Sequence, residues 1–106
     1  MSIRSLHSAK EFNAALNAAG SSLVIIDWYT TWCGPCRRIT PELEALSKVE
    51  SKCVFLKVDA EECDELAEEF QIEAFPTFTL LKNGKECRRI VGANLEKLKS
   101  KISKYQ

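Results

Sequence analysis

The 106-residue chain lacks an excess of charge of either sign, because fifteen lysines and arginines balance fifteen aspartates and glutamates. A net charge of zero leaves no overall basic field that would draw the protein to nucleic acid or to an anionic membrane surface. The longest uninterrupted aliphatic run is Leu23-Val24-Ile25-Ile26, far shorter than the roughly 18 residues of a membrane span. We therefore expect no nucleic-acid partner and no membrane partner.

The chain also lacks a visible secretory leader and an even set of cysteines. Residues 1–7 contain no apolar stretch of the kind found in signal peptides, and five cysteines cannot form a fully paired extracellular framework. No repeat, linker or biased segment interrupts a composition that is 45% hydrophobic and 28% charged, which is ordinary for a globular protein. We expect one domain over residues 1–106, with most of its thiols free. We expect a cytoplasmic location, with nuclear entry left open; the alternative is a chain whose secretory leader was already removed.

The hydrophobic pattern alternates between helix and strand periods along the chain. A capping box at Ser8 and Glu11 opens a helix that ends at Gly20, and Asn83-Gly84 is a hairpin signal. Strands are predicted at 23–29, 53–58, 77–81 and 86–91, with a weak strand before Ser8, and further helices at 34–49 (kinked by Pro41), 64–70 and after Asn94. This order predicts an α/β fold with helices on both faces of a sheet, in which the last two strands are antiparallel.

Two cysteines stand three residues apart in Trp32-Cys33-Gly34-Pro35-Cys36, directly after the apolar strand and at the start of the next helix. A helix N-terminus favours an anion, so this position should lower the pKa of the Cys33 thiol and make it the nucleophile. One helical turn places Cys36 within reach of a disulfide to Cys33, and Pro35 restricts the loop between them. The pattern predicts a redox-active dithiol.

Other interpretations of the pair remain open at this point. A zinc site needs further ligands at a suitable spacing, whereas Cys53, Cys63, Cys87 and His7 are scattered, so no metal is expected. A purely structural disulfide is rare in a reducing compartment. A binding module without turnover would be favoured by loss of either cysteine, and both are present. Isomerase or oxidase activity depends on a redox potential that the sequence does not reveal.

Asp27 is the one charged residue in the apolar strand 23–29, and it precedes Cys33 by six residues. By strand parity it shares a side with Leu23 and Ile25, so burial should raise the pKa of its carboxyl group. It is predicted to accept the proton of Cys36 during disulfide exchange. The alternative is a buried carboxyl that only satisfies a backbone donor.

The sequence resembles the thioredoxin family. The resemblance is carried by Asp27–Cys36, Phe75-Pro76-Thr77 and Val91-Gly92-Ala93, whose order and spacing match over essentially the whole chain, and Asn83-Gly84-Lys85 is similar to the eukaryotic cytosolic branch. It implies a thioredoxin fold, with a central mixed five-stranded sheet flanked by four helices. It also implies a general protein-disulfide reductase that supports electron transport and cell redox homeostasis.

The resemblance further implies how such a protein works. It is a monomer without a bound cofactor, its redox centre is the Cys33–Cys36 pair, and its partners are disulfide-containing client proteins and a thioredoxin reductase that recharges it with electrons from NADPH. Trp32 shields the disulfide, and Pro76 is a cis-proline whose loop pairs with an extended client segment through Phe75. The predicted catalytic residues are Cys33, Cys36, Asp27, Gly34 and Pro35, and the predicted substrate-binding residues are Trp32, Ala74, Phe75, Pro76, Gly92 and Ala93.

Some positions depart from the family pattern or extend it. Arg37-Arg38 replaces a common lysine, and Ala74 stands where some animal members carry a cysteine that forms covalent dimers. Lys57 is the candidate for a lysine that relatives place near the buried aspartate. Cys63 matches an extra cysteine of animal members and is predicted to be an exposed, regulatory thiol. Gly92 is expected to allow a close backbone approach along the client-binding groove, with a strand-end turn as the alternative. The acidic run 59–69 is interpreted as a solvated face, with partner selection as the alternative.

Overall fold

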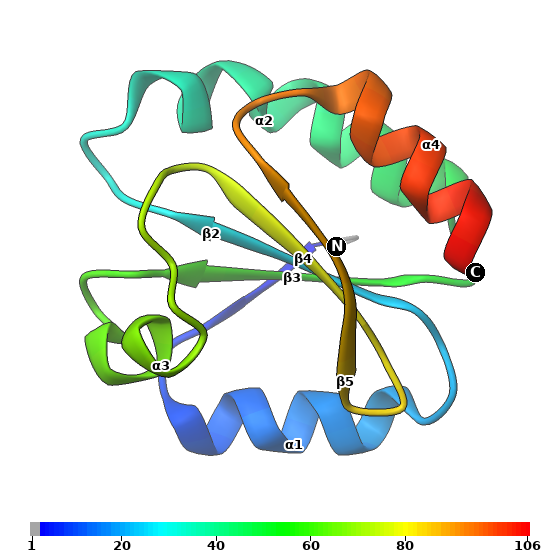
Figure 1. Cartoon of the computed structure of the whole chain (residues 1–106), viewed down its shortest axis with the longest axis horizontal. Helices are drawn as coiled ribbons and strands as arrows, with labels where there is room; N and C mark the ends of the chain where they lie inside the picture. The colour runs from blue at the N-terminus through cyan, green and yellow to red at the C-terminus, as the bar shows by residue number, and fades with distance from the viewer. Residues whose placement is uncertain (1–2) are drawn as a thin grey trace.

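The computed structural model describes residues 3–106 as a five-stranded sheet between two layers of helices (Figure 1). Along the chain the elements are β1 (Ile3–Leu6), α1 (Ala9–Ala19), β2 (Val24–Tyr29), α2 (Gly34–Val49), β3 (Val54–Asp59), α3 (Asp64–Glu69), β4 (Thr77–Lys82), β5 (Lys85–Val91) and α4 (Leu95–Tyr105). The strands lie in the order β1-β3-β2-β4-β5. β1, β3 and β2 run parallel, and β4 and β5 are antiparallel to their neighbours. The predicted mixed sheet with helices on both faces is confirmed.

The two faces of the sheet bury separate apolar clusters, because successive side chains of a strand point to opposite sides. β2 is the central strand and is buried on both faces, as its unbroken apolar run predicts. One cluster packs under α1 and α3 and includes Phe12, Val24, Ile26, Trp28 and Leu66. The other packs under α2 and α4 and includes Leu23, Ile25, Leu43, Leu98 and Ile102. Parity therefore directs Asp27 toward the α2 and α4 side.

Local sequence signals set the ends of several elements. The Ser8 hydroxyl accepts a hydrogen bond from the Glu11 N–H at 3.1 Å, so the predicted capping box begins α1. Asn83 and Gly84 both have positive φ, at 52° and 80°, the geometry of a two-residue hairpin turn between β4 and β5. α2 continues through Pro41 as one helix. None of the helices in residues 3–106 is long and apolar enough to cross a membrane.

Candidate active site

The dithiol lies at the junction of β2 and α2, where the central strand delivers the chain to a helix N-terminus (Figure 1). Cys33 and Cys36 are joined by a disulfide, with their Cα atoms 5.3 Å apart. Cys33 is the N-cap residue of α2, and its sulfur accepts a hydrogen bond from the Cys36 N–H at 3.1 Å. The residues are 5% and 4% exposed, so exposure does not separate the two thiols. The two thiols differ in their position relative to the helix N-terminus, which stabilises negative charge on the Cys33 sulfur.

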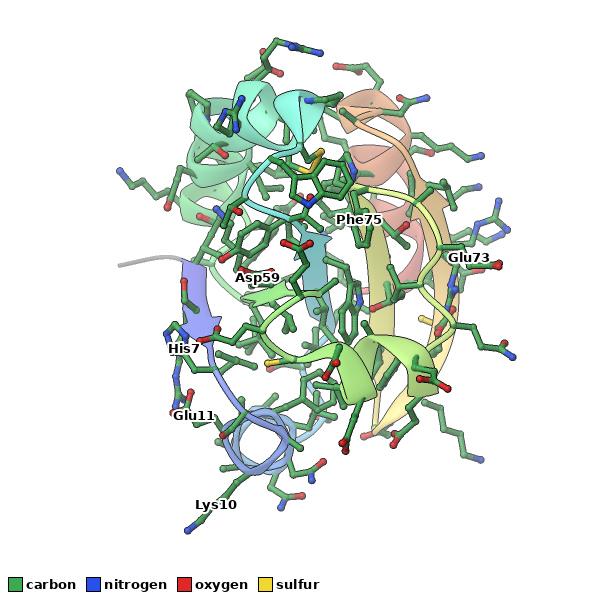
Figure 2. The ribbon with its side chains drawn as sticks, turned by 90° about the vertical axis from the view of Figure 1, so that its left-hand side faces the viewer. His7, Lys10, Glu11, Asp59, Glu73 and Phe75 are labelled. Carbon is green, nitrogen blue, oxygen red and sulfur yellow. A yellow bond between two sulfur atoms is a disulfide. The ribbon has the colours of Figure 1, made fainter. Side chains whose placement is uncertain are left out.

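An aromatic rim borders the disulfide. Trp32 is 64% exposed, and its ring meets the Phe75 ring edge-to-face at 6.2 Å between centroids. The Trp32 Nε1–H donates to Glu61 Oε2 at 3.0 Å, which holds the indole in place. In Figure 2, Phe75 lies at the end of the molecule that carries the yellow disulfide bond. Trp32 and Phe75 therefore present an apolar surface beside the reactive sulfurs.

The loop that ends at Pro76 has the geometry that the family resemblance implied. The Phe75–Pro76 peptide bond is cis, which confirms the expected cis-proline. Ala74 is exposed, and its carbonyl accepts a hydrogen bond from the Thr77 hydroxyl at 2.6 Å. The Gly92 N–H donates to the Pro76 carbonyl at 2.8 Å, which ties the end of β5 to this loop.

The backbone conformation of Gly92 favours glycine. A side chain at this position would meet no atom within 4 Å, so space is not the constraint. Its φ is +99°, a conformation that residues with a side chain rarely adopt. This conformation supports the alternative of a strand-end turn, and the close approach of a client backbone at Gly92 stays a prediction. The neighbouring Ala93 is exposed.

Asp27 lies in β2 opposite Lys57 of β3 and is 2% exposed. Burial raises the pKa of its carboxyl group to about 7, and the positive charge of Lys57 opposes this rise. The Asp27 Oδ1 atom has no hydrogen-bond partner, which argues against a carboxyl that only satisfies a backbone donor. Lys57 lies where the family resemblance suggested a lysine, with its Nζ 4.6 Å from the centre of the Tyr29 ring.

A pocket of about 240 Å³ brings the second cysteine together with Lys57, the cross-strand neighbour of Asp27. Cys36 and Lys57 both line it, with Tyr29 and Thr40 among the other residues of its wall. Arg37, at its edge, donates from Nη1 to the Thr31 carbonyl at 2.7 Å and braces the loop before Trp32.

Cys63 differs from the expectation. It is 8% exposed and packs in the α1 and α3 cluster, so the prediction of an exposed thiol is wrong. Burial first, and then the surrounding acidic side chains, raise the pKa of its thiol and keep it protonated. Sequence parity could not reveal this, because Cys63 precedes α3 in a turn whose packing depends on α1 and β3.

The remaining cysteines and the histidine serve local structure. Cys87 lies in β5 and Cys53 just before β3, and both are half-buried free thiols. His7 contacts the Glu62 carboxylate through Nδ1 at 2.9 Å. Among residues 3–106 no three or more His, Cys, Asp or Glu side chains are arranged to hold a metal ion.

Two residues of this region were missed by the sequence analysis. Glu61 belongs to the acidic run that was interpreted as a solvated face, yet its carboxylate holds Trp32. Arg37 was noted only as a departure from lysine, yet its guanidinium fixes the Thr31 carbonyl. Neither contact has a sequence signal, because each joins residues whose proximity depends on how the loop after β2 folds.

Chemistry that breaks and remakes disulfide bonds needs a reversible dithiol, a stabilised thiolate and an open surface for the other disulfide. The β2–α2 junction supplies all three, and the chain is a thiol-disulfide oxidoreductase. Comparison with known proteins supports this assignment. The profile of the thioredoxin family matches residues 4–104. The chain belongs to the thioredoxin family.

Individual relatives span the same length. Thioredoxin from the marmoset Callithrix jacchus is 40% identical over 103 residues, which cover 97% of this chain and 98% of that protein. Thioredoxin from the horse Equus caballus is 41% identical over 100 residues, or 94% and 95% of the two chains. The solved thioredoxin of Fasciola hepatica superposes with a TM-score of 0.94 at 38% identity and covers 97% of this chain and 99% of its own.

We expect the two active-site thiols to react at different rates after reduction. Near neutral pH, iodoacetamide should modify Cys33 at least tenfold faster than Cys36, because the helix N-terminus stabilises the Cys33 thiolate. A time course of peptide mass spectrometry measures both rates. Cys63 provides an internal control and should react slowly, because the raised pKa of its thiol keeps it protonated. Faster labelling of Cys36 would reverse the two roles.

Proposed function

We propose that the protein is a general protein-disulfide reductase. The Cys33 thiolate attacks a disulfide of a client protein, which forms a mixed disulfide between Cys33 and one client sulfur and releases the other as a thiolate. Cys36 then attacks the Cys33 sulfur, which releases the second client thiolate and leaves the Cys33–Cys36 disulfide. Two electrons pass to the client. The observation that carries this proposal is the Cys33–Cys36 pair at the start of α2 beside an exposed aromatic rim.

Asp27 is the proton acceptor for the second step. Cys36 attacks as a thiolate, and its proton must leave before or during the attack. A carboxyl group with a pKa of about 7 is half ionised near neutral pH, the condition in which a base both accepts and releases a proton readily. The pocket shared by Cys36 and Lys57 supports this transfer. Gly34 and Pro35 hold the two sulfurs in reach of each other.

The client binds across the rim. An extended client segment pairs with the backbone of Phe75 beside the cis-proline, while Trp32 and Ala74 contact its side chains and Gly92 and Ala93 border the other side of the groove. Backbone pairing of this kind accepts many sequences, which suits a reductase with many clients.

The cycle closes when a thioredoxin reductase reduces the Cys33–Cys36 disulfide with electrons from NADPH. The disulfide is then the only redox centre of this chain, which acts as a monomer without a bound cofactor. The protein would carry electrons in the cytoplasm and support cell redox homeostasis. About 40% identity to mammalian thioredoxins over nearly the full chain supports this assignment.

Insulin reduction tests the proposed function. With NADPH and a thioredoxin reductase, the protein should reduce insulin disulfides catalytically, and NADPH absorbance at 340 nm should fall. Omission of the reductase or of this protein should each stop NADPH oxidation. Binding of insulin without turnover, even with the reductase present, would instead indicate a binding module.

A further inference from the structure

A bulge in β5 turns two charged side chains toward the same face of the sheet. In the pairing with β4, Leu80 lies opposite Arg88 and Leu81 lies opposite Glu86, so Cys87 is an extra residue. Residues three apart in a regular strand point to opposite faces, and the extra residue brings Glu86 and Arg89 to one side. There Arg89 Nε and Nη2 donate to the two oxygens of the Glu86 carboxylate, each at 2.9 Å.

The same guanidinium holds the chain that leaves α3. Arg89 Nη2 donates to the Phe70 carbonyl at 2.6 Å, and Nη1 donates to the Gln71 carbonyl at 3.0 Å. Gln71 has a φ of 55°, which is uncommon for a residue with a side chain. Its turn is closed by the Ile72 N–H, which donates to the Ala67 carbonyl at 2.9 Å. Arg89 therefore stabilises a turn that the local sequence does not favour.

The turn leads directly to the rim of the active site. Only four residues separate Gln71 from Pro76, and the last of them is Phe75, which contacts Trp32. Figure 2 shows Glu73 and Phe75 along this segment. A hollow of about 760 Å³ lies against it, lined by the segment itself, α3 and Arg89. The segment borders this hollow on one side, while the side chains of Phe70, Ile72 and Phe75 pack against the α1 and α3 cluster. Its backbone is held at one end by the Arg89 contacts and at the other by the hydrogen bond from Gly92 to Pro76.

We propose that Arg89, oriented by Glu86, is a positioning residue for client binding. It touches neither the two cysteines nor the client. It holds the segment 70–76 so that the Phe75 backbone stands ready to pair with an extended client strand, and it thereby sets the affinity for a protein disulfide. The inference rests on the proposed function, since it specifies how that site holds its protein substrate. A small disulfide reacts with the Cys33–Cys36 pair alone and does not use this segment.

The test compares two disulfides in one series of variants. Wild type, Arg89→Gln, Arg89→Lys and Glu86→Gln are assayed with insulin, with dithiothreitol as the reductant. The same proteins, reduced beforehand and freed of reductant, are then mixed with 5,5′-dithiobis(2-nitrobenzoate) in a single turnover. Arg88→Gln is the matched control, because it removes the same positive charge from the neighbouring residue of β5, whose side chain points to the opposite face of the sheet. Loss of charge-assisted hydrogen bonds should raise the KM of Arg89→Gln for insulin about tenfold with kcat unchanged. The rate with the small disulfide should stay within about twofold of wild type.

A conservative variant and amide hydrogen exchange distinguish a loss of segment positioning from a general loss of structure. Arg89→Lys keeps the charge without the planar fork, so its KM should lie between those of wild type and Arg89→Gln. Hydrogen exchange of the amides in residues 72–75 should accelerate in Arg89→Gln and Glu86→Gln while α2 and β2 stay protected. If Arg89→Gln does not fold, Glu86→Gln carries the same comparison.

Three results would overturn the proposal: equal losses with insulin and the small disulfide, an unchanged KM for insulin, or unchanged exchange in residues 72–75. A wild-type protein that reduces the small disulfide but not insulin would contradict the proposed function itself. In that case the exchange measurement would still decide whether Arg89 positions the segment.

Discussion

Cys36→Ser should trap client proteins as mixed disulfides on Cys33. The nucleophile and its helix N-terminus remain, so attack on a client disulfide should proceed, but the thiolate that releases the client is missing. Insulin turnover should fall by roughly a thousandfold or more, as expected when a group that makes or breaks the covalent bond is removed. Non-reducing gels of a lysate treated with the variant, followed by mass spectrometry, should show adducts that disappear with dithiothreitol.

Serine variants of the other four cysteines are the controls. Cys33→Ser removes the attacking sulfur and should form no adducts, whereas Cys53→Ser and Cys87→Ser should leave turnover and adduct formation unchanged, since both side chains lie outside the β2–α2 junction. Cys63→Ser should also leave insulin turnover unchanged, because that thiol is buried with a raised pKa. A Cys36→Ser protein that captures no client would contradict the proposed order of attack.

Asp27→Asn should stabilise the protein increasingly as pH rises. The pKa of about 7 in the folded protein lies above the ordinary value of 3.8 for an aspartate, so the native state holds the proton of Asp27 more tightly than the unfolded chain does. The stabilising contribution of this protonation is complete below pH 4 and is lost as pH rises to about 7. Between pH 5 and pH 9 wild type should lose about 3 kcal/mol relative to Asp27→Asn, from about two pH units at 1.36 kcal/mol each.

Urea unfolding of both proteins at pH 5 and pH 9 measures this difference. Both proteins are kept oxidised, so that Cys33 and Cys36 do not titrate. The titration of His7 is common to both proteins and therefore cancels in the difference between their unfolding free energies. The same substitution should slow insulin reduction near pH 7 by about a hundredfold, because Cys36 loses its proton acceptor. A stability difference that does not change with pH, together with undiminished reduction, would contradict both the raised pKa and the proton-transfer role.

The local pattern was sufficient for most of the fold. The capping box at Ser8, the continuous apolar run of β2 and the Asn83-Gly84 turn act over a few residues, and each produced the predicted element. The dithiol was equally visible, because a cysteine pair three residues apart at a strand-to-helix junction defines its own environment. Resemblance to the thioredoxin family added the cis bond at Pro76, which no local signal indicates.

Contacts between distant segments decided the rest. The partner of Asp27 depends on the register of β2 against β3, which places Lys57 opposite it. The burial of Cys63 depends on the packing of α1 and α3, and the hydrogen bonds of Arg89 depend on a bulge that shifts one strand by a residue. The sequence by itself thus determined the order of elements and predicted Cys33 as the nucleophile, since both inferences rest on local backbone preferences. Only the tertiary structure decided which buried and charged groups meet, because burial and electrostatics act between residues that folding alone brings together.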